Sequence, residues 1–249
     1  MSRLVILGTS YAVPDATHEN TYLALEGRGG IILVDCPASP VVRLAQVGLS
    51  LEEVTDVILT HFHPDHAAGA PLMLMNMWLM GRTAPLNLFG PAHCLERLRM
   101  VMGMFGWSRW PGLFPVDLHS LPEEEASLSL ESPDFRIVSS PVRHLIPTLG
   151  LRVECRSGAV VAYSSDTEPC PAVIRLAQGA DVLLHEATGL MPGHSSAGQA
   201  GEVARAAGAK SLYLIHYRPG AEAGRLVSEA EETFSGRVVL AEDLMVIEL

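Results

Sequence analysis

The sequence has few positively charged residues, and this limits the kinds of partner that it is expected to bind. Its 249 residues contain a single lysine, Lys210, and the formal net charge at pH 7 is −11. Proteins that grip a nucleic-acid backbone neutralise phosphates with clustered Lys and Arg side chains, whereas the arginines here are dispersed along the chain. The charge therefore disfavours a large nucleic acid as partner and leaves only a local basic patch open.

Cysteine pairs and long apolar runs are also lacking. No apolar run reaches the roughly 18 residues of a membrane span, and the N-terminal run over residues 4–7 is too short for a signal peptide. Scattered cysteines without a Cys-x-x-Cys pair are typical of buried thiols in a reducing compartment. The chain has four such residues: Cys36, Cys94, Cys155 and Cys170. We therefore expect a cytoplasmic protein that does not enter a membrane.

The apolar pattern predicts an α/β fold, in one domain over residues 1–249 with no linker. Strands are expected over residues 3–7, 21–25, 31–35, 54–59, 86–89, 128–130, 135–139, 150–155, 160–163, 181–184, 211–215, 238–240 and 244–247. Helices are expected over residues 72–80, 94–104, 171–178 and 196–207, with a short one ending near Gly48. Strand runs flanked by helices in both halves predict an αββα sandwich, two mixed sheets with helices outside.

Residues 70–113 differ from the rest in composition. They hold all three tryptophans and seven of the ten methionines. Methionine fills irregular gaps in cores and also serves adaptable surfaces. Two interpretations stay open: a helix pair packed on the sheet, or a segment that walls the mouth of an active site or forms a homodimer face.

One short stretch is dense in metal-ligand types. His61, His63, Asp65 and His66 fall within six residues, directly after an apolar run that predicts a buried strand. Pro64 disfavours a helix at this point, so the side chains are expected on a strand-to-helix loop. Neutral imidazole and carboxylate groups suit zinc, manganese or iron. The stretch therefore predicts a metal site.

Polar residues also follow other predicted strands. Ligand sets in α/β proteins gather at the carboxyl ends of strands, and four later residues stand at or near such ends: His144, Asp166, His194 and His216. Asp35 ends a neighbouring strand, where its carboxylate would either hold a metal-binding histidine by its second nitrogen or cap a turn.

These motifs carry a family resemblance. The order His-x-His-x-Asp-His, then His, then Asp in a Ser-Asp-Thr turn, then His after a strand resembles the metallo-β-lactamase superfamily over nearly the whole chain. The His-Glu-Ala-Thr run at residues 185–188 and the His-Ser-Ser run at 194–196 look like the ribonuclease Z branch and its phosphodiesterase relatives. The resemblance implies two divalent metal ions, one held by His61, His63 and His144, the other by Asp65, His66 and His216, with Asp166 bridging. It also matches His194 to an extra histidine near the leaving group.

The chain departs from that family in two places. Ribonuclease Z proteins insert a long tRNA-clamping arm between the positions matching His144 and Asp166, where this chain has only 21 residues. Ser165 also stands where the family usually has glycine. The missing arm and the negative charge argue against processing of precursor tRNA. True two-zinc β-lactamases have a cysteine in place of Asp166, so antibiotic hydrolysis is disfavoured too.

We therefore predict a dinuclear metal-dependent hydrolase, a phosphodiesterase acting on a small or nucleotide-like ester. Two ions about 3.5–4 Å apart would activate a shared water and clamp the reacting oxygens. Asp65 would bind one metal and orient the nucleophile. His194 would protonate the leaving alkoxide, because an imidazole keeps a protonated fraction at neutral pH.

Several alternatives stay open. The same centre would serve a carboxylic ester, thioester or lactone hydrolase, and a ribonuclease Z activity or a non-catalytic metal-binding protein is less favoured. The metal is expected to be zinc, with manganese or iron open. Arg218 would contact a phosphate or form a surface salt bridge, and Glu186 is left without an assigned role.

Overall fold

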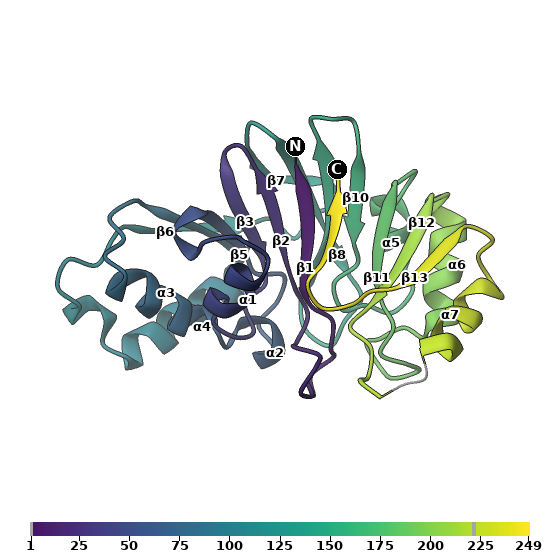
Figure 1. The fold of residues 1–249 in the computed structure, drawn as a ribbon, viewed down its shortest axis with the longest axis horizontal. Helices are drawn as coiled ribbons and strands as arrows, with labels where there is room; N and C mark the ends of the chain where they lie inside the picture. The colour runs from purple at the N-terminus through teal and green to yellow at the C-terminus, as the bar shows by residue number, and fades with distance from the viewer. Residues whose placement is uncertain (1, 221–222) are drawn as a thin grey trace.

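Two seven-stranded sheets form the centre of the protein (Figure 1). The computed structural model describes residues 2–220 and 223–249. The first sheet contains, in spatial order, β14 (Met245–Glu248), β1 (Arg3–Gly8), β2 (Tyr22–Gly27), β3 (Gly30–Val34), β4 (Val54–Ile58), β5 (Leu86–Pro91) and β6 (Val116–Leu121). The second contains β13 (Arg237–Leu240), β12 (Ser211–Ile215), β11 (Val182–Glu186), β10 (Val160–Tyr163), β9 (Thr148–Cys155), β8 (Phe135–Val142) and β7 (Ser127–Glu131).

Both sheets are mixed. In the first, β14, β1, β2 and β3 pair antiparallel, and β3 to β6 pair parallel. In the second, β7 to β10 pair antiparallel, and β10 to β13 pair parallel. Each parallel half therefore places the carboxyl ends of its strands along one edge, which is where α/β proteins gather functional side chains.

Helices cover the outer face of each sheet (Figure 1). On the first sheet these are α1 (Val41–Gln46), α2 (Pro64–Ala67), α3 (Ala70–Leu79) and α4 (Ala92–Met104), with 3-10 turns at Leu51–Glu53 and Trp107–Arg109. On the second they are α5 (Pro171–Leu176), α6 (Ala197–Ala207) and α7 (Ala223–Glu231). The expected αββα sandwich is confirmed.

Central strands such as β1 are apolar on both faces because they border two cores. In β1, Val5 and Leu7 pack in the core beneath the helices, whereas Leu4 and Ile6 pack between the sheets. A strand buried on both faces reads as a continuous apolar run. This is why β1 and β4 were predictable from short runs.

The single-turn helix α2, the strand β6 and the helix α7 were not expected. Proline is tolerated in the first turn of a helix, so α2 begins at Pro64 and carries Asp65 and His66, which were expected on a loop. β6 is an edge strand whose Val-Asp-Leu-His-Ser-Leu sequence leaves most side chains partly or fully exposed, so its apolar signal is weak. α7 buries Ala230 against α6, at a place where a Cβ on Gly201 would lie 2.6 Å from the Ala230 carbonyl oxygen. Close backbone packing of this kind needs small residues and leaves little apolar pattern in the sequence.

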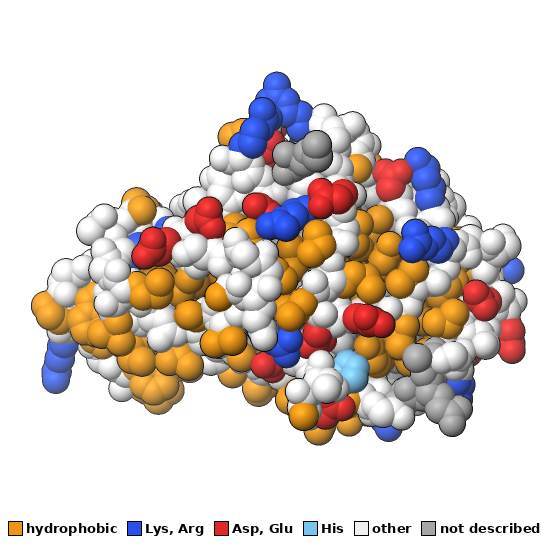
Figure 2. Space-filling view, in the orientation of Figure 1, with side chains coloured by type: hydrophobic (Ala, Val, Ile, Leu, Met, Phe, Trp, Pro, Cys, Tyr) orange, Lys and Arg blue, Asp and Glu red, His pale blue; other side chains and the backbone are white. Residues whose placement is uncertain are grey.

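Residues 70–113 combine features of both interpretations. Met73, Met77 and Met102 are buried in the core beneath the helices, whereas Met104 and Phe105 are exposed. Figure 2 shows hydrophobic side chains gathered over the lobe that Figure 1 labels α3 and α4. A hollow of about 340 Å³ also lies in this lobe, lined by Ala68 after α2, by three side chains of α3, and by Phe105 and Trp110 on either side of the 3-10 turn. Lid and dimer roles for this segment stay predictions.

Other expectations can be compared directly. The four cysteines are buried and free, as predicted. Among the described residues, the helices are all too short or too polar to span a lipid bilayer. A cytoplasmic location stays a prediction.

Candidate metal centre

The first group of candidate ligands comes from both sheets. His61 and His63 lie on the loop after β4, His144 follows β8 and Asp166 follows β10. His63 Nδ1 and His144 Nε2 are 3.1 Å apart. Asp166 Oδ2 lies 3.8 Å from the Nε2 atoms of both His61 and His144. The four ligand atoms all fall within 4.8 Å of one another.

The second group shares Asp166 with the first. The Nε2 atoms of His66 and His216 are 3.4 Å apart, and Asp166 Oδ1 lies 3.4 Å from the first and 3.5 Å from the second. Asp65 Oδ2 completes the group at 3.7 and 3.5 Å from the same two nitrogens. Asp166 thus turns one oxygen toward each group, the arrangement that a bridging carboxylate needs.

These separations fit metal ions. A tetrahedral ion with ligand bonds of 2.0–2.1 Å holds its ligand atoms about 3.3 Å apart, close to the distances in both groups. His61 Nε2 and Asp166 Oδ1 are moreover buried without a hydrogen-bond partner among the residues that the structure describes. Burying unpaired polar atoms is costly, and a bound cation would satisfy both. The residues therefore fit a pair of divalent ions, and the chain brings together all seven positions expected from its sequence.

Hydrogen bonds set the tautomers of the histidines. His66 Nδ1 donates to Asp35 Oδ2 at 2.8 Å, and His144 Nδ1 donates to the Gly193 carbonyl at 2.7 Å. A carbonyl or carboxylate oxygen only accepts, so each ring carries its proton on Nδ1. The Nε2 lone pairs of both rings are therefore free to face the ligand groups.

Two threonines do the same for the other rings. The Thr188 hydroxyl donates to the His216 carbonyl at 2.8 Å, so it accepts from His216 Nδ1 at 2.9 Å. The Thr60 hydroxyl donates to the Asp35 carboxylate at 2.9 Å and accepts from His61 Nδ1 at 3.0 Å. Partners of this kind orient ligating histidines and raise their basicity.

The electrostatics of the site suit histidines that bind a metal in their neutral form. Burial lowers the pKa of His61 well below its usual value, and it also lowers the pKa values of His63 and His144. These rings are therefore neutral at pH 7, as metal ligation requires. Burial would lower the pKa of His66 as well, but the Asp166 and Asp35 carboxylates raise it well above its usual value. A divalent ion would compete with that proton for the same negative charge.

His194 lies beside both ligand groups but is a member of neither. Its ring centroid is 4.9 Å from that of His144 and stacks on His216 at 5.9 Å. His194 Nδ1 lies 2.9 Å from Glu186 Oε1. Burial would lower the pKa of His194, but its hydrogen bond to Glu186 raises it. The ring therefore keeps a larger protonated fraction at neutral pH than a free imidazole.

The structure shows the contacts of Asp35 and Glu186, whose roles the sequence left open. Asp35 does both things considered for it: it accepts from His66 and from the Thr60 backbone amide at 2.8 Å. Glu186 is fully buried and accepts from the Thr167 and Thr188 amides at 2.9 and 3.1 Å. Its carboxylate is therefore held in place for His194.

Arg218 forms no ion pair with another described residue. Its guanidinium carbon lies 5.6 Å from the centre of the Tyr11 ring, and its Nη2 lies 2.8 Å from Met191 Sδ. A phosphate contact by Arg218 stays a prediction.

Three contributors were missed by the sequence analysis: the Thr60 and Thr188 hydroxyls and the Gly193 carbonyl. The two threonines had a signal, because Thr60 directly precedes the metal motif and Thr188 ends the His-Glu-Ala-Thr run. His18 was left out of the site and lies against Asp15 and Tyr217. His185 is buried with Nδ1 on the Glu186 carbonyl.

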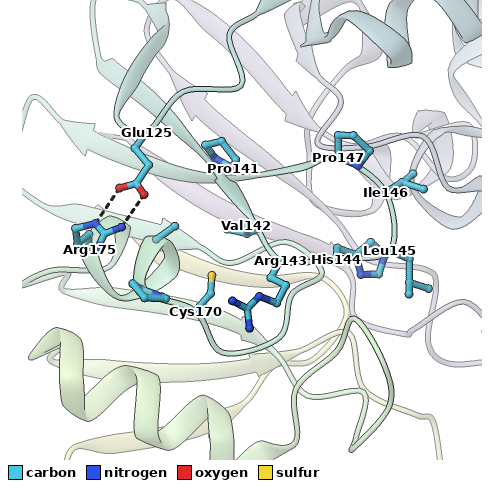
Figure 3. Close-up of a pocket in the computed structure, with 12 residues that line it drawn as sticks. Glu125, Pro141, Val142, Arg143, His144, Leu145, Ile146, Pro147, Cys170 and Arg175 are labelled. Atoms are coloured by element: carbon cyan, nitrogen blue, oxygen red, sulfur yellow. Dashed lines mark hydrogen bonds and ion pairs between the residues drawn. The ribbon is translucent and has the colours of Figure 1, made fainter.

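A surface cavity of about 670 Å³ lies beside His144 (Figure 3). Figure 3 shows His144 at one end of it and an ion pair between Arg175 and Glu125 at the other, joined by two hydrogen bonds of 2.6 and 2.8 Å. Arg143 also lines the cavity. The cavity next to His144 is therefore lined by both apolar and charged side chains.

The chain is similar in sequence to known proteins. The family described as "Beta-lactamase superfamily domain" matches residues 31–217. Ribonuclease Z of Methanothermobacter thermautotrophicus is 31% identical, over 100% of this chain and 97% of that protein. That alignment spans 306 positions, against the 249 residues of this chain, so the relative carries additional segments.

Solved structures share the fold and lead to the family. The short form of human tRNase Z is 25% identical, with a TM-score of 0.80 over 99% of this chain and 98% of that one. The metallo-beta-lactamase fold protein YhfI from Bacillus subtilis is 21% identical, with a TM-score of 0.85 over 100% and 99%. The chain therefore belongs to the metallo-β-lactamase superfamily, in its ribonuclease Z-like and phosphodiesterase branch, and is a metal-dependent hydrolase.

Proposed function

We propose that the protein is a dinuclear phosphodiesterase that acts on a small or nucleotide-like phosphodiester. The observation that carries this proposal is the His194–Glu186 pair, whose imidazole ring lies 4.9 Å from His144 of one ligand group and 5.9 Å from His216 of the other. A general acid beside the metals is what a poor alkoxide leaving group needs. A carbonyl substrate has less need of it.

The proposed ligands divide as the two groups do. His61, His63 and His144 would hold one ion and Asp65, His66 and His216 the other, with Asp166 between them. Bound divalent ions supply charge neutralisation and activate water in such sites. Zinc suits this donor set best, and manganese or iron would also accept it.

The remaining steps belong to side chains. Asp65 is only partly buried, with 14% of its side chain exposed, so its carboxylate can hold the proton of the attacking water and orient it. His194 donates a proton to the leaving oxygen. Glu186 holds the His194 ring by Nδ1 and stabilises its protonated form.

A second candidate function is cleavage of precursor tRNA. It is favoured by the full-length similarity to proteins named ribonuclease Z. The net charge of −11 and the short connection of 21 residues between His144 and Asp166 favour the smaller substrate.

A comparison of three substrates tests the proposal. The purified protein, loaded with zinc or manganese, would be given bis-p-nitrophenyl phosphate, p-nitrophenyl acetate and a precursor tRNA. We expect metal-dependent turnover of the phosphodiester that clearly exceeds turnover of the acetate and of the tRNA. Preferred cleavage of the acetate would move the function to carbonyl esters, and efficient processing of the tRNA would replace it with ribonuclease Z activity.

A further inference from the structure

Ser165 adopts a backbone conformation that serine rarely takes. Its φ angle is +53° and the residue is fully buried. L-amino acids with a Cβ are disfavoured in this left-handed region, which glycine enters freely. Strained residues of this kind persist where the surrounding structure requires them, and they cluster at functional sites. The question is what the serine side chain adds that glycine would lack.

The Ser165 hydroxyl joins the two sheets at the metal centre. Its Oγ donates to Thr60 Oγ1 at 3.0 Å, across 105 residues of sequence. Thr60 follows β4 of the first sheet and precedes His61, whereas Ser165 follows β10 of the second sheet and precedes Asp166. One hydrogen bond therefore links the neighbour of a proposed terminal ligand to the neighbour of the proposed bridging ligand.

Counting protons on Thr60 shows how the serine acts. A hydroxyl has one proton and two acceptor sites. The Thr60 proton goes to the Asp35 carboxylate, and one acceptor site takes His61 Nδ1. The Ser165 hydroxyl fills the second acceptor site. All three sites of this buried hydroxyl are then used, which fixes its direction toward His61.

Hydrogen bonds do little to hold the proposed bridging carboxylate. Asp166 Oδ1 is buried without a hydrogen-bond partner among the described residues, and the charged or polar rings within 3.8 Å of the carboxylate are histidines that are themselves proposed metal ligands. The position of this side chain therefore depends on its own backbone turn, which the neighbouring Ser165 hydroxyl ties to the first sheet.

We propose that Ser165 is a positioning residue for the metal centre, whose hydroxyl sets the distance and orientation between the His61 ring and the Asp166 carboxylate. The inference rests on the proposed dinuclear site and concerns metal binding, not the choice of substrate. Loss of the hydroxyl should leave the fold intact. The Leu149 amide still donates to the Thr60 carbonyl at 3.1 Å, and Ser164 Oγ still holds the Ser165 carbonyl at 2.6 Å.

Two substitutions separate the hydroxyl from the backbone strain. Ser165→Ala removes the hydroxyl and keeps the strained φ, whereas Ser165→Gly removes the hydroxyl and relieves the strain. Ser139→Ala is the matched control, because Ser139 is a fully buried serine of β8 whose hydroxyl has no partner among the described residues. Zinc affinity would be measured for all four proteins by chelator competition, with no substrate present.

We expect both Ser165 variants to lose about 10- to 100-fold in zinc affinity, the usual effect of removing a group that orients metal ligands. The Ser139 variant should bind as wild type does. The cobalt-substituted Ser165 variants should also show altered visible absorption, because a shifted bridge changes the ligand geometry. A stability change alone would leave that spectrum unmoved.

Three results would overturn the inference. Zinc affinity within twofold of wild type in both variants would show that the hydroxyl positions nothing. A loss in Ser165→Ala that Ser165→Gly does not share would show that the hydroxyl only offsets the strain of its own backbone and does not set the ligand geometry. Failure of the wild-type protein to bind zinc, manganese or iron would remove the metal centre itself, and with it the proposed function. This last result can be told apart from a failure of the Ser165 inference, because it is obtained with the wild-type protein before any variant is measured.

Discussion

At the scale of single residues, Asp35 links the two proposed metal positions. It accepts from His66 Nδ1 and from the Thr60 hydroxyl, which in turn accepts from His61. One buried carboxylate therefore orients a histidine of each group. Burial raises the pKa of Asp35, so the protein maintains this group at a cost to its stability.

Replacing Asp35 by asparagine should separate metal binding from folding. Asparagine tolerates the left-handed φ of +65° at this position, but it brings no negative charge. We expect zinc affinity to fall about 10- to 100-fold, while the melting temperature of the metal-free protein does not fall. Chelator competition and thermal unfolding measure the two effects. Asp56→Asn in β4 is the control, and equal zinc affinity in both variants would contradict the role given to Asp35.

His194 is expected to act on the leaving group. His194→Ala should lower kcat for an alkyl phosphodiester by about 10²- to 10⁴-fold, the usual contribution of a general acid. The p-nitrophenyl ester should lose much less, since nitrophenolate departs without a proton. His93→Ala, outside the site, serves as control. An equal loss for both leaving groups would show that His194 does something other than donate a proton.

The sequence predicted the ligand types better than the groups that orient them. His61, His63, Asp65 and His66 were recognisable because ligand residues rarely crowd so closely. The Thr188 and Ser165 contacts depend on left-handed turns at His216 and Ser165. A single sequence does not show that a residue other than glycine has a positive φ, so these contacts could be found only in the structure.

At the scale of elements, most strands and helices were predictable from apolar runs. A strand buried on both faces, such as β1, is a nearly continuous apolar segment, and β4 has a shorter apolar run at its carboxyl end. β6 was missed as a half-exposed edge strand and α7 as a helix with a narrow buried stripe. Which strand ends converge was not derivable from the pattern, since pairing depends on contacts between distant residues such as Thr60 and Leu149.

A turn-to-turn contact joins the sheets away from the site. Asp134, before β8, accepts from the Arg28 and Gly29 amides of the β2–β3 turn at 2.7 and 3.3 Å and from the Arg28 guanidinium at 3.0 Å. Burial alone would raise the pKa of Asp134, but the hydrogen bonds and charge of Arg28 lower it. The ionised form is therefore the stabilising one.

This contact predicts a dependence of stability on pH. A carboxyl whose pKa is lowered on folding stabilises the protein fully above its unfolded pKa, about 3.9, and this stabilisation is lost as the pH falls through the folded value. Asp134→Asn should therefore lower the urea midpoint at pH 7, and the gap from wild type should narrow in acid. A gap that is constant between pH 7 and pH 3 would contradict the ionic contribution.

At the scale of the whole molecule, charge and size bear on the substrate. The one lysine, Lys210, is paired with Asp181 at 2.5 Å. On the face shown in Figure 2, Lys and Arg side chains stand in several separate places, and some of them lie beside Asp and Glu. The similarity to ribonuclease Z is in tension with this surface, and that residues 1–249 act as one domain stays a prediction.

Salt dependence should distinguish the substrate classes. A protein that makes 6–10 phosphate contacts loses about 10³- to 10⁵-fold in affinity between 50 and 200 mM salt. We expect KM for bis-p-nitrophenyl phosphate to change little over this range. We also expect binding of precursor tRNA to be weak even at 50 mM salt. Tight tRNA binding that collapses by 200 mM would instead favour the ribonuclease Z function.

The central claim, a catalytic pair of metal ions bridged by Asp166, is tested most directly by metal content. Wild type and Asp166→Asn, purified without chelators, would be compared by elemental analysis beside hydrolysis of bis-p-nitrophenyl phosphate. The account predicts about two ions per wild-type chain, fewer in the variant, and loss of hydrolysis with them. One ion or none in an active wild-type protein, or full activity in the variant, would contradict it.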